Sequence, residues 1–170
     1  MTQLEADGSQ PAAALVELDG LSALRAVMTG ELPPPPMAAL MGMELLEVEP
    51  GRALFAATPG PQHYNPLGTV HGGLAATLID SATGCAVHTT LPRGATFTTI
   101  DLQVRYVRAI TSDTGRVLCE GTIVHRGRTL ATAQATLTAG DRLLAHGTAS
   151  LLIRPPDART ASTAPPASGS

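Results

Sequence analysis

The chain has 170 residues, 44% of them hydrophobic, and a formal net charge of -3. This length and composition predict one domain with a core of its own. The net negative charge, the lack of a basic cluster and the presence of only four aromatic residues (Phe55, Tyr64, Phe97 and Tyr106) argue against nucleic-acid binding as the main role.

The cysteines and histidines show no metal-binding pattern. Cys85 and Cys119 are far apart and form no CxxC-type motif, so neither a zinc site nor a disulfide framework is predicted. His88, His125 and His146 have no ligand spacing with one another, and we expect no metal. The first residues contain no basic segment followed by an apolar run, and no apolar stretch reaches 18 residues. These features predict a soluble cytoplasmic protein without a membrane partner.

In chain order, residues 1–18 are predicted to be a flexible segment. A short helix is expected to begin at Asp19 and to end at Gly30, because apolar residues between them follow helical spacing (Leu21, Leu24 and Met28). The prolines at 33–36 are expected to form an extended, stiff spacer, because proline fixes φ and lacks an amide donor.

Two strands are predicted next, at 43–49 and 52–58, with a turn at Pro50-Gly51 between them. Three acids lie on the first strand, and we interpret them as a solvated strand edge rather than as catalytic groups (Glu44, Glu47 and Glu49).

A central helix is predicted at 72–89, after a loop at 59–70 that is rich in glycine and proline. Its apolar stripe contains large and small side chains (Leu74, Ala75, Leu78, Ile79, Ala82, Cys85 and Ala86). Small residues cover much of the remaining surface, so a sheet or a second helix can approach closely. One acid, Asp80, lies inside this apolar segment.

Strand patterns follow at 97–108, 116–125, 129–138 and 142–153. In the first, apolar and polar residues alternate with a period of two, the apolar set being Ile100, Leu102, Val104 and Tyr106. Short polar turns predict antiparallel hairpins between consecutive strands (Ser112-Asp113, Arg126-Gly127 and Gly140-Asp141).

The order of elements predicts an α+β fold in which one helix is laid on an antiparallel sheet. Residues 155–170 have low complexity and are expected to be disordered, which leaves a single domain at 19–154.

The start of the central helix is a candidate binding site. Gly72 and Gly73 leave the helix N-terminus bare, so a carbonyl oxygen or a phosphate can approach the Gly72 N–H. The alternative interpretation is a glycine hinge that lets the loop turn. The residues alone do not separate these two interpretations.

Asp80 is the candidate catalytic acid. A carboxylate among apolar neighbours suits general-base chemistry or direct attack on an activated acyl group. The alternative is a hydrogen-bonded structural acid at a contact between two helices.

The separation of these groups has a consequence for assembly. Gly72 and Asp80 are eight residues apart, or roughly 12 Å along a helix axis. One carbonyl carbon cannot contact both within a chain. If both serve one site, that site must combine two helices across a two-fold axis, which predicts a homodimer.

The loop before the helix contributes further polar candidates. The amide of Asn65 can orient a water molecule or donate to a carbonyl oxygen. For His71 we favour a role in ordering the loop over direct chemistry, and the role of His63 is left open.

These residues form a motif. His63, Asn65, Gly68, His71, Gly72 and Gly73 match the pattern HxNxxGxxHGG, and Asp80 lies nine residues after the second histidine. The motif resembles that of the hotdog-fold acyl-CoA thioesterases of the phenylacetate-pathway (PaaI-like) type. The resemblance spans about residues 40–153, including the later segment Thr99–Leu102 and the turn at Gly127-Arg128.

The resemblance implies a hotdog fold, in which a curved antiparallel sheet wraps a long helix, and a dimer that often pairs into a tetramer. It also implies hydrolysis of an acyl-CoA thioester without a cofactor, since coenzyme A is part of the substrate. The Gly72 N–H would polarise the thioester carbonyl, and Asp80 of the other subunit would act as base or nucleophile. Asn65 would help to place the water or the carbonyl.

Further roles follow from the same resemblance. Thr99 matches a serine or threonine that assists the acid, although Thr98 is adjacent and points to the opposite face. His71, His63 and Gly73 are expected at the substrate. Arg126 and Arg128 match, more loosely, positions that contact the phosphates of coenzyme A.

Two other functions are compatible with the same fold. Hotdog hydratases or dehydratases also use an acid and a histidine, but here Asn65-Pro66 lacks the acid that precedes it in their signature. A non-catalytic acyl-CoA sensor usually carries a DNA-binding module, and residues 1–42 are too short and insufficiently basic for one. The acyl group stays open between an aryl-acetyl group and a medium aliphatic chain.

Overall fold

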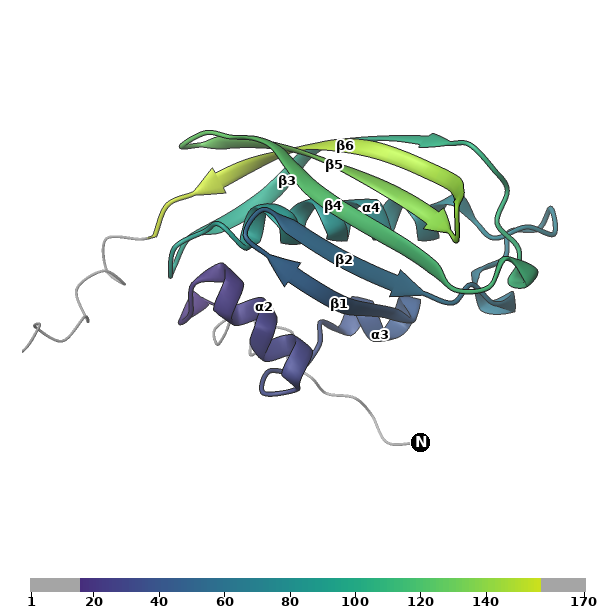
Figure 1. Cartoon of the computed structure of the whole chain (residues 1–170), viewed down its shortest axis with the longest axis horizontal. Helices are drawn as coiled ribbons and strands as arrows, with labels where there is room; N and C mark the ends of the chain where they lie inside the picture. Colours follow the sequence, from purple (N-terminus) through teal and green to yellow (C-terminus); the bar gives the residue numbers. More distant parts are fainter. Residues whose placement is uncertain (1–15, 157–170) are drawn as a thin grey trace, which may run out of the picture.

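The computed structural model describes residues 16–156, so most of the predicted flexible segment 1–18 and of the predicted tail 155–170 lies outside the described residues. Within this range one six-stranded antiparallel sheet, with strand order β1-β2-β4-β5-β6-β3, curves around the long helix α4 (Figure 1). The central elements are β1 (Met43–Glu49), β2 (Arg52–Ala57), α4 (Gly72–His88), β3 (Thr96–Tyr106), β4 (Val117–Arg126), β5 (Leu130–Ala139) and β6 (Arg142–Arg154). The α+β class and the hotdog arrangement are confirmed.

Helix α4 lies directly against the backbone of the sheet. The side chains on its inner face are buried (Leu74, Leu78, Ile79, Ala82, Ala86 and Val87). On β4, a Cβ added to Gly121 would lie 2.3 Å from the Ala82 carbonyl oxygen, so no side chain fits there. On β6, a Cβ added to Gly147 would lie 2.9 Å from a methyl carbon of Ile79. The glycines at these two positions therefore allow α4 to pack closely against the backbone of the curved sheet.

The predicted N-terminal helix is confirmed as α2 (Gly20–Thr29). The Asp19 side chain accepts a hydrogen bond from the Ser22 N–H at 3.0 Å, and Gly30 ends the helix with a φ of 79°. The Gly20 N–H donates to the Leu91 carbonyl oxygen at 3.0 Å, which ties α2 to the segment that follows α4. No helix among residues 16–156 is long and apolar enough to cross a membrane.

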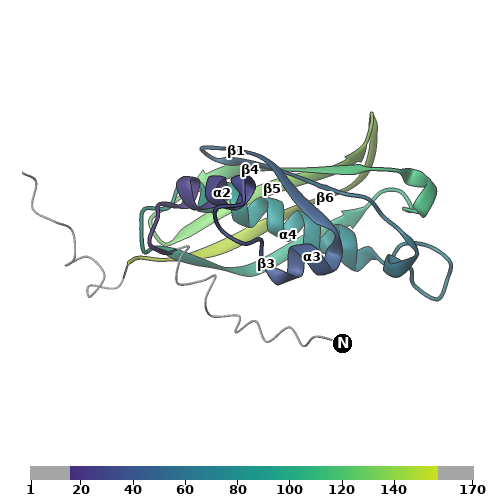
Figure 2. The same ribbon diagram turned by 90° about the horizontal axis from the view of Figure 1, so that it is seen from below.

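The prediction of an extended proline spacer is correct only in part. Pro36 is the first residue of a short helix, α3 (Pro36–Met41), and Pro35 before it is extended with a ψ of 140°. A proline is accommodated at the first helical position because its missing N–H would have no partner there. Seen from below, α2 and α3 lie in front of α4, on the side that the sheet leaves open (Figure 2).

The predicted hairpin through Ser112-Asp113 is wrong. Strand β3 pairs with β6, whereas β4 pairs with β2 and β5, so the chain crosses from one edge of the sheet to its interior between β3 and β4. The β4–β5 and β5–β6 hairpins are confirmed. Strand β3 therefore forms an edge of the sheet, and none of its residues is buried.

The alternation in β3 is interrupted by a β-bulge. Thr99 pairs with Leu151 and Asp101 with Ser150, so Ile100 is an extra residue without a partner. Ile100 is 57% exposed, whereas Leu102 and Val104 are partly buried against the core. The expectation that Ile100 shares their face is wrong, because a bulge changes the phase of the strand by one residue.

Candidate active site

The loop before α4 is held by its own side chains. The Asn65 carbonyl Oδ1 accepts from the Leu67 N–H at 2.8 Å, and its Nδ2 donates to Thr69 Oγ1 at 3.0 Å. Gly68 adopts a φ of 81°, in the left-handed region that favours glycine. Both ends of the Asn65 amide are therefore engaged within the loop.

The two histidines of the motif occupy different environments. His63 is buried, its Nδ1 accepts from the Gly60 N–H at 3.0 Å, and its carbonyl oxygen accepts from the His71 N–H at 2.7 Å. His71 is exposed at the start of α4, where its Nδ1 accepts from the Gly73 N–H at 2.8 Å. The His71 side chain thus caps the helix by satisfying one of its free N–H groups.

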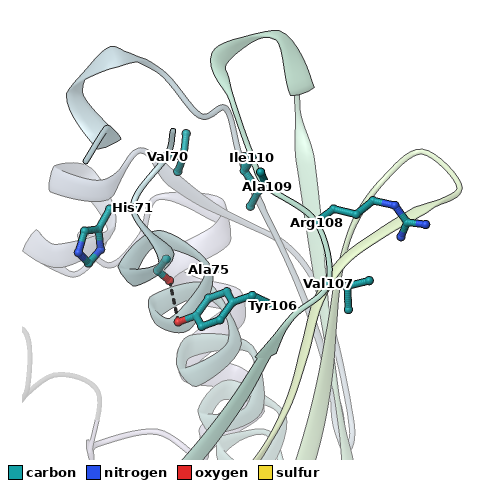
Figure 3. A pocket seen from close by; sticks show the side chains of 9 residues that line it. Val70, His71, Ala75, Tyr106, Val107, Arg108, Ala109 and Ile110 are labelled. Atoms are coloured by element: carbon teal, nitrogen blue, oxygen red, sulfur yellow. Dashed lines mark hydrogen bonds between the residues drawn. The ribbon is translucent and has the colours of Figure 1, made fainter. Parts of the chain in front are cut away.

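The first turn of α4 opens into a small pocket. Its volume is about 260 Å³, and its walls come from the helix start and from the end of β3 with the segment after it (Val70, His71, Gly72, Ala75 and Tyr106 to Ile110; Figure 3). No hydrogen bond to the Gly72 N–H occurs among residues 16–156. A donor without a partner is therefore available beside a pocket at the positive end of a helix.

Asp80 lies on α4 and is partly buried. The Thr99 hydroxyl donates to Asp80 Oδ1 at 2.9 Å, so the structure brings these two predicted residues together. The neighbouring Thr98 is exposed, so the contact with Asp80 comes from Thr99 and not from Thr98.

A second, larger pocket of about 750 Å³ contains Asp80 and Thr99. One face of α4 lines it over two turns, from Asp80 through Gly84 and Cys85 to His88. The other walls are mostly apolar and come from α2, the proline segment, β1, β2 and β3 (among them Leu24, Val27, Met28, Met37, Leu45, Phe55 and Phe97). Asp80 and Glu44 are the acids on its wall.

Burial favours the neutral form of two other titratable groups in this pocket, Cys85 and His88. Burial raises the pKa of the Cys85 thiol to about 12, and the charge of Asp80 adds to this rise. The thiol therefore stays protonated and is a poor nucleophile. Burial also lowers the pKa of His88, with a partial offset from Asp19. Within residues 16–156, no cluster of three or more histidine, cysteine or acidic side chains is placed to hold a metal ion.

The remaining predicted residues are not gathered at these pockets. Gly72 and His71 line the small pocket and Asp80 and Thr99 line the large one, whereas Asn65, His63 and Gly73 line neither. Arg126 and Arg128 are exposed near the turn between β4 and β5, where Arg126 Nε donates to Thr90 Oγ1 at 3.4 Å. This places them beyond the C-terminal end of α4.

Other residues at the pockets were not predicted. Tyr106 covers Gly72 in the small pocket, and α2 forms a wall of the large one. Arg108 also lines the small pocket, although its guanidinium donates to the Leu143 carbonyl oxygen at 2.6 Å and points away in Figure 3. The sequence shows Tyr106 only as part of an alternating strand, which carries no information about its neighbour on the helix.

Comparison with known proteins identifies the family. A model described as the thioesterase superfamily matches residues 67–146. Acyl-coenzyme A thioesterase 13 of Mus musculus is 33% identical over 105 residues, which cover 61% of this chain and 74% of that protein. A curated relative from Halobacterium salinarum is 42% identical over 72 residues, 41% of this chain, and the match spans about half (46%) of that relative.

A solved structure agrees with the sequence matches. A point mutant of the phenylacetic acid degradation protein PaaI from Thermus thermophilus aligns with a TM-score of 0.63 and 27% identity, covering 69% of this chain and 97% of that chain. The chain therefore belongs to the thioesterase superfamily, among the hotdog-fold acyl-CoA thioesterases of the PaaI-like type.

Proposed function

We propose that the protein hydrolyses an acyl-CoA thioester in a site shared by two subunits, with the Gly72 N–H of one and Asp80 of the other. The observation that carries this proposal is that Gly72 and Asp80 line two different pockets of one chain. One pocket contains the N–H donor and the other contains the carboxylate. A site that combines both groups therefore needs a second copy of the chain.

The exposed edge of the sheet supports a dimer. Strand β3 has 11 residues, forms an edge and carries Ile100 and Tyr106 at 57% and 58% exposure. Unpaired edges of this kind readily pair with another strand. Antiparallel pairing of β3 with its own copy about a two-fold axis would bring the Thr99 end of one strand toward the Tyr106 end of the other. This pairing would join a large pocket to a small one, and we expect such dimers to pair again into a tetramer.

The proposed reaction follows from the groups in each pocket. The Gly72 N–H donates to the thioester carbonyl oxygen and stabilises the negative charge that develops there, an effect typically worth about 10²–10³ in rate. Asp80 either removes a proton from the attacking water or attacks the carbonyl carbon itself, and Thr99 holds its Oδ1 in place. Collapse of the intermediate releases coenzyme A as a thiolate. Where Asp80 itself has attacked, water then hydrolyses the acyl anhydride on Asp80 and releases the free acid.

The large pocket is proposed to hold the acyl group. Its walls are aliphatic and aromatic, and its acid Glu44 is paired with Arg116 at 2.8 Å. Among residues 16–156, none that lines it is a lysine or an arginine, so the pocket offers no cation to pair with a second carboxylate on the substrate. An apolar acyl group, either a medium aliphatic chain or an aryl-acetyl group, therefore fits better than a dicarboxylic one. Asn65 contributes by holding the loop before α4 in its conformation. Arg126 and Arg128 are proposed to contact the phosphates of coenzyme A.

Thiol release from a panel of acetyl-, hexanoyl-, decanoyl-, phenylacetyl- and succinyl-CoA tests the activity. We expect hydrolysis of the apolar thioesters and little of succinyl-CoA. Hydration of crotonyl-CoA, followed by absorbance, would identify a hydratase instead. Binding of these compounds without any turnover would indicate a sensor and would contradict the proposal.

Subunit exchange tests the shared site. In a heterodimer of Asp80→Ala and Gly72→Pro chains, the second of which lacks the backbone N–H at position 72, one of the two sites has both groups intact. An equal mixture of the two inactive variants is expected to recover about a quarter of the wild-type activity, because half of its dimers are mixed and each has one good site. No recovery in verified heterodimers would place both groups in one chain's site.

A further inference from the structure

The peptide unit between Gly72 and Gly73 is held at both ends by side chains. The Tyr106 hydroxyl donates to the Gly72 carbonyl oxygen at 3.2 Å, and the Gly73 N–H donates to His71 Nδ1 at 2.8 Å. Figure 3 shows the Tyr106 ring lying over the first turn of α4, with the His71 ring on the other side of the helix start. Two side chains from different parts of the chain are thus hydrogen-bonded to one planar peptide unit.

Both contacts favour glycine, because a Cβ at either position would force the neighbouring side chain to shift. A Cβ on Gly72 would lie 3.0 Å from two carbons of the Tyr106 ring, and a Cβ on Gly73 would lie 2.8 Å from His71 Nδ1. The two glycines therefore make room for the two side chains that hold them. A flexible hinge explains neither contact, because it would leave the peptide free.

The Gly72 N–H belongs to the preceding peptide, whose carbonyl oxygen, that of His71, accepts from the Leu74 N–H at 3.1 Å. We propose that Tyr106 and His71 are positioning residues that clamp the Gly72–Gly73 peptide, so that φ and ψ of Gly72 are fixed between two held peptides and its N–H points toward the thioester carbonyl. This inference rests on the proposed function. Glycine has the widest choice of φ and ψ of any residue, so an unclamped Gly72 would sample several N–H directions. A donor stabilises a transition state best when it is oriented before the reaction begins.

The clamp predicts a particular kinetic signature. The negative charge on the carbonyl oxygen develops fully only in the transition state, so a misdirected N–H lowers kcat more than it changes KM. A residue that merely contacts the substrate would instead change KM, and a residue that merely stabilises the helix would lower the melting temperature without changing the kcat of the folded protein.

Tyr106→Phe is the first test, because it keeps the ring and removes the hydrogen bond to the Gly72 carbonyl oxygen. We expect kcat to fall about tenfold, less than the roughly 10²–10³ for loss of the donor itself, with KM within about twofold. Tyr64→Phe is the matched control. Its hydroxyl accepts from the Ser112 N–H at 2.8 Å and lines neither pocket, so its kcat is expected to stay at the wild-type value.

His71 offers a rescue experiment. His71→Ala removes the acceptor for the Gly73 N–H and is expected to lower kcat about tenfold, whereas His71→Asn keeps a side-chain acceptor at the helix start and should restore most of it. Equal kcat in the two variants would show that the acceptor is not what matters at this position.

Carbonyl polarisation provides a readout that does not depend on turnover. In an Asp80→Asn background, bound phenylacetyl-CoA with a ¹³C carbonyl is expected to show a lowered infrared stretching frequency, and adding Tyr106→Phe should remove part of that shift. A wild-type protein that cleaves no thioester would overturn the proposed function. An active protein whose Tyr106→Phe variant keeps the wild-type kcat and the full infrared shift would overturn only the clamp.

Discussion

The two pockets beside α4 are built in opposite ways. The small pocket at Gly72 lies between the start of α4 and residues 106–110 at and after the end of β3, and it offers an N–H donor. The large pocket at Asp80 collects apolar side chains from α2, α3, α4, β1, β2 and β3, and it offers a carboxylate. One pocket is suited to stabilise charge on an oxygen, and the other to hold an apolar group next to a base.

The two pockets that would meet in each site of the proposed dimer are therefore expected to have different roles. Rate should depend on the polar pocket and on Asp80, whereas the choice of acyl group should depend on the apolar walls. Substitutions in the two regions are therefore expected to affect different kinetic constants.

Asp80→Asn is expected to have the largest effect. The change keeps the size of the side chain but removes its basicity, so kcat should fall by about 10²–10⁴ while the dimer stays folded. Thiol release and size-exclusion chromatography measure the two properties. Asp141→Asn in the exposed β5–β6 turn is the control. Near wild-type turnover of Asp80→Asn would remove this residue from the mechanism.

Thr99→Val is expected to have an intermediate effect. It removes the hydroxyl that donates to Asp80 Oδ1 and keeps the shape of the side chain, so kcat should fall about tenfold. The neighbouring Thr98→Val is a close control, because Thr98 is exposed and the hydrogen bond to Asp80 comes from Thr99. Similar losses in both variants would point to a general effect on β3 rather than to the hydrogen bond.

Met28→Trp should have the smallest effect on rate and should change selectivity instead. Met28 lies on the α2 wall of the large pocket and is 39% exposed, so the larger tryptophan side chain can be accommodated without unfolding the helix. We expect kcat/KM for decanoyl-CoA to fall several-fold relative to acetyl-CoA, because each methylene excluded from the pocket forfeits about 0.8 kcal/mol. An unchanged ratio would show that the acyl chain does not reach α2.

The same contrast explains what the sequence could predict. The helix-start side of the small pocket is encoded in the contiguous segment 63–73, so its loop, its glycine pair and the start of α4 are recognisable from local spacing. Its other side, Tyr106 to Ile110, comes from a distant part of the chain and is not recognisable in this way. Asp80 is recognisable because an acid in an apolar helix stands out. The large pocket depends on contacts between distant segments, and the role of α2 as one of its walls could not be read from the helical pattern of α2 alone.

The errors have the same origin. Strand periodicity located β3 to β6 well, but it contains no information about which strands pair, and the β3–β4 hairpin was wrongly inferred from a short connection. Likewise, strict alternation placed Ile100 with Leu102, because a bulge depends on the partner strand β6 and leaves no trace in the spacing of apolar residues.

The bulge at Ile100 makes β3 a strand with two independent halves. Before it, Phe97 and Thr99 face the large pocket, and after it, Leu102 and Val104 pack into the core. Mutations in the first half can therefore retune substrate choice or the setting of Asp80 while the second half keeps the hydrophobic packing unchanged. Because Ile100 itself has no partner on β6 and is 57% exposed, its side chain can change in size without disturbing the pairing on either side of the bulge.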